Sequence, residues 1–309
     1  MKRIVCLFLL LALVLTGCGA ESPNGGGISF TDDLGREVHL ESRPQRVACL
    51  LGSFADVWML SGGTVIAAPD DAWEDFGLSL EGAVNLGNTK QMSLELLLSA
   101  EPDFILASTN TRQDLLWLDT LEAAGIPAAY FDVSDFGDYL ELLSLCTRLN
   151  DRPDLYEAHG LSIQGQIEDA IARADAYIRQ EGRAPKVLFL RASATSIRAK
   201  NSRGNVTGVM LRALGCENIA DSDESLLENL SLEHILLQDP DCIFFVQSGD
   251  DTEGTRAHLE QFFRDNPAWQ TLTAVREGRV YALDKRLFNL KPNALWGRAY
   301  DILVELIWE

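Results

Sequence analysis

The chain contains one pattern twice, first as Ser93-Leu94-Glu95-Leu96-Leu97-Leu98, followed after three residues by Pro102-Asp103-Phe104-Ile105. The second copy is Ser231-Leu232-Glu233-His234-Ile235-Leu236, followed after three residues by Pro240-Asp241-Cys242-Ile243. Position 93 corresponds to 231 and position 105 to 243, so the offset is 138 residues throughout, without a gap. A repeat of this kind indicates two similar halves.

Each copy predicts a helix, a tight turn and a buried strand. The serine can accept a hydrogen bond from the free N–H groups of a helix, as an N-cap residue does. The glutamate two residues later lies in the first turn, where the helix dipole favours negative charge. A helix interior does not tolerate proline, so Pro-Asp ends the helix, and the β-rich run after it predicts a strand. A helix followed by a strand is the second half of a β-α-β unit, so the repeat predicts two α/β lobes.

The rest of the chain continues this alternation. Two alternating strands around a turn at Asp33-Leu34-Gly35 are expected over residues 28–40. Short apolar strands separated by helices indicate parallel sheets that are covered on both faces, and such sheets bind ligands beyond the carboxyl ends of their strands. Further strands are expected at 47–51, 65–68, 84–86, 104–107, 128–131, 186–190, 244–249 and 280–284, with helical patterns such as 115–124 between them.

Residues 153–180 are predicted to form one long amphipathic helix, because apolar residues recur there at three- and four-residue spacing: Ile163, Ile167, Ile171, Ala174 and Ile178. We therefore expect an α/β fold of two Rossmann-like lobes with central, mostly parallel sheets, joined by one long α-helix, with a ligand cleft between the lobes. The expected boundaries are 28–150 for the N-terminal lobe, 151–182 for the linker helix and 183–309 for the C-terminal lobe.

Residues 1–17 are predicted to be a lipoprotein signal peptide. Lys2 and Arg3 precede an apolar run, 5–16, that is too short to span a bilayer. Leu15-Thr16-Gly17-Cys18 resembles the bacterial lipobox, in which the chain is cut before the cysteine and lipid is attached to its sulfur. The alternative is an ordinary secretory signal in which Cys18 is incidental. Residues 18–27 are expected to be a flexible tether that links an extracytoplasmic protein to its lipid.

The formal net charge is −20, from 26 Lys and Arg against 46 Asp and Glu. A surface this acidic repels phosphates, which argues against nucleic acid as a partner. Beyond Cys6 and Cys18 four cysteines remain, and they show no C-x-x-C or metal-finger spacing. We interpret them as small buried hydrophobic residues, and the sequence leaves open whether any two form a disulfide: Cys49, Cys146, Cys216 and Cys242.

The chain resembles the ABC-transporter substrate-binding lipoproteins that carry ferric siderophores, haem or cobalamin, the class III periplasmic binding proteins. The most specific motif runs from Pro267 to Tyr281, which is similar to the family's P-x-W-x-x-L-x-A-V-x-x-G-R-V-Y. The repeat itself matches the family's S/N-L-E pattern, and both residues 28–40 and Pro44-Gln45-Arg46-Val47 are similar to its opening. The resemblance covers nearly the whole exported chain.

This resemblance implies a monomeric binding protein, held at the cell membrane by a lipid on Cys18, that delivers its ligand to an ABC permease. It catalyses nothing, since ATP hydrolysis belongs to a partner subunit. The resemblance also implies that Glu95 and Glu233 dock onto arginines of the permease. Taken singly, each glutamate could be no more than a partner of its helix dipole, but the matching position in two lobes favours docking.

The strongest local charge anomaly lies between Arg191 and Arg203, with four cations and no acid in thirteen residues. It follows the first strand of the second lobe, and the planar fork of arginine suits carboxylate, catecholate or phosphate oxygens. We therefore predict an anionic ferric chelate, a ferric siderophore, as the ligand; a solvated basic hairpin is the alternative. Two aromatic side chains are expected to cover the apolar face of the chelate. The predicted ligand-binding residues are Trp73, Lys90, Arg112, Arg191, Arg198, Lys200, Arg286 and Phe288.

Other ligands and functions remain as alternatives at this stage. Cobalamin or another corrinoid would be held mainly by apolar walls, and haem would need an axial Tyr or His. Motifs such as G-x-S-x-G, H-E-x-x-H and the P-loop are absent, so we predict no catalytic residues and no cofactor. A chelatase-like enzyme on the same fold and an envelope adhesin or sensor are the other classes. The four histidines are far apart in the chain, so no metal site is predicted: His39, His159, His234 and His258.

Overall fold

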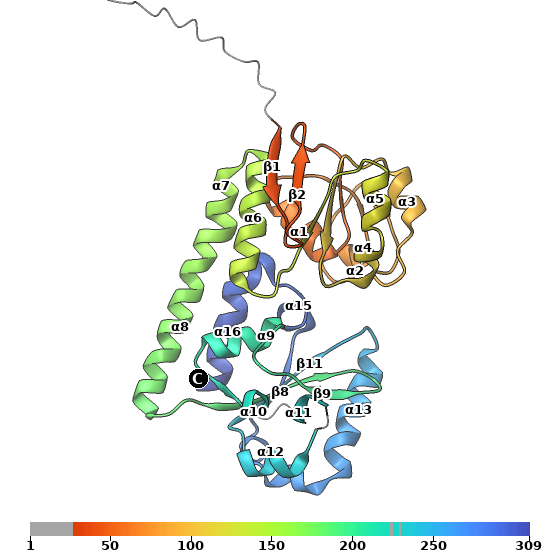
Figure 1. Ribbon diagram of the computed structural model, residues 1–309. Coiled ribbons are helices and arrows are strands. Elements are labelled where there is room, and N and C mark those ends of the chain that lie inside the picture. The colour runs from red at the N-terminus through yellow and green to blue at the C-terminus, as the bar shows by residue number, and fades with distance from the viewer. Residues whose placement is uncertain (1–26, 223–224, 229) are drawn as a thin grey trace, which may run out of the picture.

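The computed structural model describes residues 27–222, 225–228 and 230–309. Within these ranges the chain forms two five-stranded sheets, one in each half, and a two-stranded hairpin (Figure 1). The N-terminal sheet is parallel throughout, with the order β5-β4-β3-β6-β7. Its strands are β3 (Val47–Cys49), β4 (Val65–Ala68), β5 (Val84–Asn85), β6 (Phe104–Ser108) and β7 (Ala128–Phe131).

The C-terminal sheet has four parallel strands in the order β10-β8-β11-β12, and β9 pairs with β8 in the antiparallel sense. Its strands are β8 (Lys186–Ala192), β9 (Ile197–Ala199), β10 (Glu217–Asn218), β11 (Cys242–Gln247) and β12 (Val280–Leu283). In each sheet the chain adds strands first on one side of the lobe's first strand and then on the other side. This reversal lies between β3 and β6 in the N-terminal sheet and between β8 and β11 in the C-terminal sheet. The predicted fold of two α/β lobes is confirmed.

Both faces of each sheet are buried, which explains the continuous apolar runs of the central strands. In β6, Phe104 and Leu106 pack into one core and Ile105 and Ala107 into another. The first core continues from the N-terminal lobe into the C-terminal lobe, where Phe189 of β8 belongs to it. The hairpin of β1 (Ile28–Thr31) and β2 (Glu37–Leu40) covers part of the same N-terminal face.

The helices of the N-terminal lobe connect successive strands. The expected helix at 115–124 is observed as parts of two helices, which the single buried residue Trp117 separates. The helices are α1 (Gly52–Leu60), α2 (Asp71–Glu74), α3 (Leu94–Ser99), α4 (Arg112–Leu116), α5 (Leu118–Ala123) and α6 (Phe136–Asn150).

The C-terminal lobe carries more and shorter helices. The described helices, with two 3₁₀ segments, are α9 (Val206–Ala213), α10 (Ile219–Ser222), α11 (Ser225–Glu228), α12 (Leu232–Gln238), α13 (Thr252–Asp265), η2 (Pro267–Thr271), α14 (Thr273–Arg276), α15 (Lys285–Phe288), η3 (Asn293–Leu295) and α16 (Trp296–Trp308).

The sequence repeat has a common structural cause. The serines cap their helices, with Ser93 Oγ accepting from Leu96 N over 3.2 Å and Ser231 Oγ from His234 N over 3.4 Å. The residue before each proline, Glu101 or Asp239, has a positive φ, 50° and 43°.

The aspartate after each proline ties the turn to the start of the neighbouring strand. Asp103 Oδ1 accepts from Arg46 N over 2.9 Å, and Asp241 Oδ2 accepts from Lys186 N over 2.8 Å. The Pro-Asp pair therefore ends the helix and aligns the next strand with the first strand of its lobe.

One continuous run of helix joins the lobes, as predicted. It consists of α7 (Pro153–Tyr156), a π-helical turn at Glu157–Leu161 and α8 (Ser162–Glu181). Gly182, with φ 75°, ends it. In Figure 1 this run lies along one side of both lobes, and α16 lies against it. Burial of Ile163, Ile167, Ala170 and Ala174 fastens α8 to the shared core.

The four cysteines that the structure describes are buried free thiols, so none of them forms a disulfide. Burial raises the pKa of Cys242 to about 11. The interpretation as small core residues is confirmed.

Candidate functional site

The carboxyl ends of the N-terminal strands border a cavity of about 560 Å³. Leu51 lies just beyond β3, residues 110–113 follow β6, and Thr89 and Lys90 lie beyond β5. Since strand order reverses between β3 and β6, this is where a doubly wound sheet binds its ligand. The structure brings Lys90 and Arg112 together on this cavity, and both side chains are exposed.

The basic stretch of the C-terminal lobe forms a hairpin at the corresponding edge of the second sheet. Arg191 lies near the end of β8 and is the register partner of Arg198 in β9, with Lys200 just beyond that strand. His258 of α13 steadies the turn, its Nδ1 lying 2.9 Å from the carbonyl oxygen of Ser193. We call Arg191, Arg198 and Lys200 the cationic hairpin.

These three side chains have no counter-charge among the residues that the structure describes. Within the described part of the chain they make no hydrogen bond or ion pair, and Nε of Arg191 is buried without a partner. Burial lowers the pKa of Arg191. Burial and the positive charges of Arg191 and Arg198 lower the pKa of Lys200. Three cations that repel one another in this way favour an anion beside them.

The segment after β12 holds the two lobes together. Nζ of Lys285 donates to Asp75 of the N-terminal lobe over 2.8 Å and to Asp250, which follows β11, over 2.7 Å. Arg286 donates to Asp56 of α1 over 3.1 Å. These contacts bring the carboxyl edges of the two sheets to one junction.

Three of the predicted ligand residues lie in other surroundings. The charge of Arg286 is paired with Asp56, and its guanidinium lies 4.0 Å from the ring centre of Phe76. Phe288 is only 2 % exposed, because α15 turns it into the core, so it has no free face for a ligand. Trp73 of α2 is half-buried and packs against the same core.

The sequence did not single out Lys291, Asp71 or Asp114, since isolated charges in loops and short helices carry no periodic signal. Asp71 accepts from Gly52 N, with both oxygens at 3.1 Å. Burial raises the pKa of Asp71 to about 6. Asp114 is fully buried; its Oδ2 accepts from Ser108 N over 2.8 Å and its Oδ1 has no partner. Burial, opposed by the Ser108 hydrogen bond, raises the pKa of Asp114 to about 7.

We expect Asp114→Asn to flatten the pH dependence of stability. The folded state keeps a proton on Asp114 up to about pH 7, whereas the unfolded chain loses it near pH 4. The free energy of unfolding therefore falls as pH rises through this window, by up to about 1.4 kcal/mol per pH unit from this group. In urea unfolding, the free energy of unfolding should fall between about pH 5 and about pH 7 in the wild type. In the variant this fall should be smaller by about 1–2 kcal/mol. An equal loss in both proteins would assign the pH dependence to other groups.

Glu95 and Glu233 lie in the first turns of α3 and α12, and both side chains are exposed. Figure 1 shows these helices on the outer sides of the two lobes, away from the junction. Neither glutamate forms an ion pair within the described ranges. The pair is therefore free for contact with another molecule.

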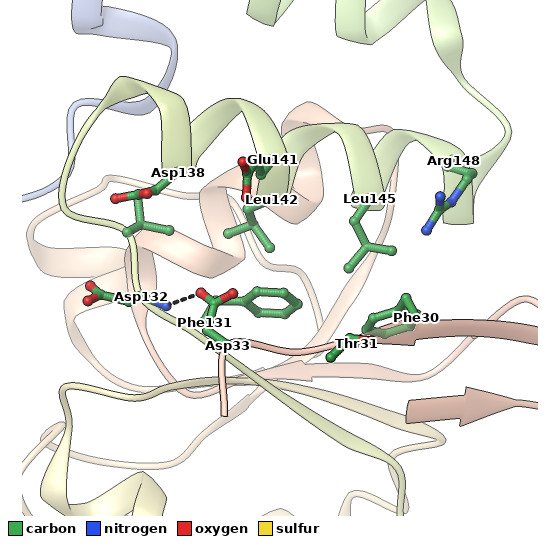
Figure 2. A pocket seen from close by; sticks show the side chains of 11 residues that line it. Phe30, Thr31, Asp33, Phe131, Asp132, Asp138, Glu141, Leu142, Leu145 and Arg148 are labelled. Carbon is green, nitrogen blue, oxygen red and sulfur yellow. Dashed lines mark hydrogen bonds between the residues drawn. The ribbon is translucent and has the colours of Figure 1, made fainter. Parts of the chain in front are cut away.

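A second cavity, of about 360 Å³, lies beneath α6 and beside the hairpin of β1 and β2 (Figure 2). Several acidic residues line it, but backbone donors occupy the carboxylates at its centre. Asp33 accepts from Asp132 N over 2.6 Å, and Asp138 accepts from Ser134 N over 2.8 Å. Among the described residues no group of three or more His, Cys, Asp or Glu side chains could hold a metal ion.

The family model described as periplasmic binding protein matches residues 47–287, more than half of the chain. The chain belongs to the periplasmic binding protein family. Its members bind substrates for transport, so the protein is a binding protein and not an enzyme, and the chelatase alternative is excluded.

Two curated relatives cover nearly all of this periplasmic binding protein. The Fe(3+)-citrate-binding protein YfmC of Bacillus subtilis is 26 % identical, over 91 % of this chain and 89 % of its own. The putative ABC transporter substrate-binding lipoprotein YhfQ of the same organism is 25 % identical, over 94 % and 93 %. Among solved structures, Staphylococcus aureus SirA complexed with staphyloferrin B has a TM-score of 0.70 and 20 % identity, over 90 % of this chain and 98 % of its own, which shows the fold.

Membership of the family implies a permease and its ATPase as partners and an extracytoplasmic location. In the part of the chain that the structure describes, every helix is too short or too polar to cross a bilayer. Cys18, the predicted lipidation site, lies outside the described residues.

Proposed function

We propose that this protein is a lipid-anchored monomer that captures an anionic ferric chelate and delivers it to the permease of an ABC importer. The cationic hairpin carries the proposal. In a chain of net charge −20, three cations that have no counter-charge among the described residues meet at the edge where an α/β lobe binds its ligand.

The opposite lobe supports the same ligand class. Lys90 and Arg112 border the cavity at the carboxyl edge of the N-terminal sheet, and the residues that line this cavity include no His or Tyr to serve as an axial haem ligand. Ferric citrate, which the name of the relative YfmC specifies, is an anion of the required kind. A chelate between the two edges would meet cations from both lobes.

Fluorescence-quench titration of the purified protein tests this proposal. The panel contains ferric citrate, a ferric catecholate siderophore, haem and cobinamide. We expect the tightest binding for an anionic ferric chelate, because its oxygens can pair with the cationic hairpin. Tightest binding of cobinamide or haem, unaffected by added salt, would contradict the anionic ligand while leaving the transport role in place.

The lipid anchor is proposed from the lipobox-like Leu15-Thr16-Gly17-Cys18. Cys18→Ala removes the sulfur that would carry lipid, so the variant should move from the membrane fraction to the soluble extracytoplasmic fraction. Intact-mass analysis of the wild type should show a lipidated N-terminal cysteine. A wild-type mass without lipid would contradict the anchor, and Cys6→Ala is the control that should keep its membrane location.

A further inference from the structure

Lys291 reaches the ligand edge of the N-terminal sheet from the other half of the chain. It lies between α15 and η3, and its Nζ is 5.6 Å from the ring centre of Phe54, which follows β3. Within the described residues its ammonium group makes no hydrogen bond or ion pair. A half-buried cation without a direct partner is costly unless another group neutralises it.

The backbone around Lys291 is fixed on both sides, so its position does not depend on a ligand. Nη1 of Arg286 donates to the carbonyl oxygen of Lys291 over 2.7 Å. Two residues further on, Asn293 has φ 55° and is fully buried. Its Nδ2 donates to Ser53 O over 2.9 Å and to Asp56 over 2.8 Å, both in the N-terminal lobe. Asn293 thus holds this segment of the C-terminal half against α1.

The carboxylates near Lys291 already have other donors. The groups whose charges act on it are Asp132, Asp71 and Asp114, which follow β7, β4 and β6. Asp71 accepts from Gly52 N and Asp114 from Ser108 N. Asp132 Oδ1 accepts from Nδ2 of Asn110 over 2.5 Å and from Oγ of Ser134 over 2.9 Å. Burial lowers the pKa of Lys291, against the attraction of these three aspartates.

We propose that Lys291 is a ligand-binding residue whose ammonium pairs with an anionic oxygen of the chelate at the junction of the two lobes. This inference rests on the proposed function. It adds a cation on a fixed backbone segment to the exposed Lys90 and Arg112 and to the cationic hairpin. Because Lys291 belongs to the C-terminal half but lies at the N-terminal ligand edge, a bound anion would link the two halves.

The test compares Lys291→Met, which keeps length and removes charge, with Lys291→Arg, which keeps charge. Arg179→Met is the matched control, since Arg179 is an exposed cation of α8 away from the junction. The probe is ferric citrate with excess citrate, replaced by the tightest binder of the panel if that is another ferric chelate. The Kd is measured for the full-length proteins at low and high salt, below the melting temperature of each variant.

We expect Lys291→Met to raise the Kd about tenfold, and Lys291→Arg and Arg179→Met to stay within about threefold of the wild type. The Kd of Lys291→Met should also depend less on salt, because one screened attraction is gone; a loss of packing alone would not change that dependence. Equal Kd values for Lys291→Met and Arg179→Met overturn the inference. A Kd of Lys291→Arg that is as high as the Kd of Lys291→Met also overturns it. If the wild type binds none of the ferric chelates, the proposed function itself fails and the inference falls with it.

Discussion

Replacing Arg191 and Arg198 by alanine together should weaken binding of the ferric chelate by about a hundredfold or more. A hydrogen bond to a charged group contributes about 1.5–3 kcal/mol, and each 1.4 kcal/mol is a factor of ten in Kd. Both arginines lack partners among the described residues, so their removal should not cost stability and should relieve repulsion with Lys200. We therefore expect an unchanged or raised melting temperature together with the loss of affinity.

Titration and thermal unfolding of the same variant separate these two effects. Arg212→Ala is the control, because Arg212 is an exposed cation of α9 in the same lobe. If the variant binds the chelate with the wild-type Kd, the cations of the hairpin are solvated surface residues without a role in binding. A variant that loses affinity and stability in parallel would assign the arginines a structural role instead.

The fold could be predicted because its signals are local. Ser93 and Ser231 cap helices, and Asp103 and Asp241 align strands through contacts that short stretches of sequence specify. The cationic hairpin was found in the same way, since the residues of β8 and β9 are near neighbours in the chain.

The junction of the two lobes could not be predicted, because it depends on contacts between distant residues. Asn293 meets Ser53 across 240 positions, and Arg286 meets Asp56 across 230. Sequence placed Phe288 correctly after a strand, but only the packing of α15 against the shared core decides that its ring points inward. Lys291 acquires its surroundings from four segments of the N-terminal lobe at once, which no pattern within its own segment indicates.

The docking role of Glu95 and Glu233 is a prediction about transport without a change in ligand binding. The two glutamates lie on α3 and α12, whereas the cations of the proposed site lie at the junction edges. On α12, Leu237 is 80 % exposed and stands one turn beyond Glu233, so it shares that face of the helix.

Glu95→Ala combined with Glu233→Ala should reduce transport of the chelate and stimulation of the importer's ATPase by up to about thirtyfold. Each exposed ion pair is worth about 0–1 kcal/mol, so a single variant tests the idea poorly and the pair sets the upper limit at about 2 kcal/mol. The Kd for the chelate should stay at the wild-type value. Asp119→Ala with Glu253→Ala is the matched control, because these are exposed first-turn acids of α5 and α13, one in each lobe. If the control slows transport equally, the effect comes from net charge, and if the Glu95 and Glu233 variant loses the chelate, the glutamates act in binding. Docking requires that transport is lost while ligand binding stays intact, and that this happens only in the variant of Glu95 and Glu233.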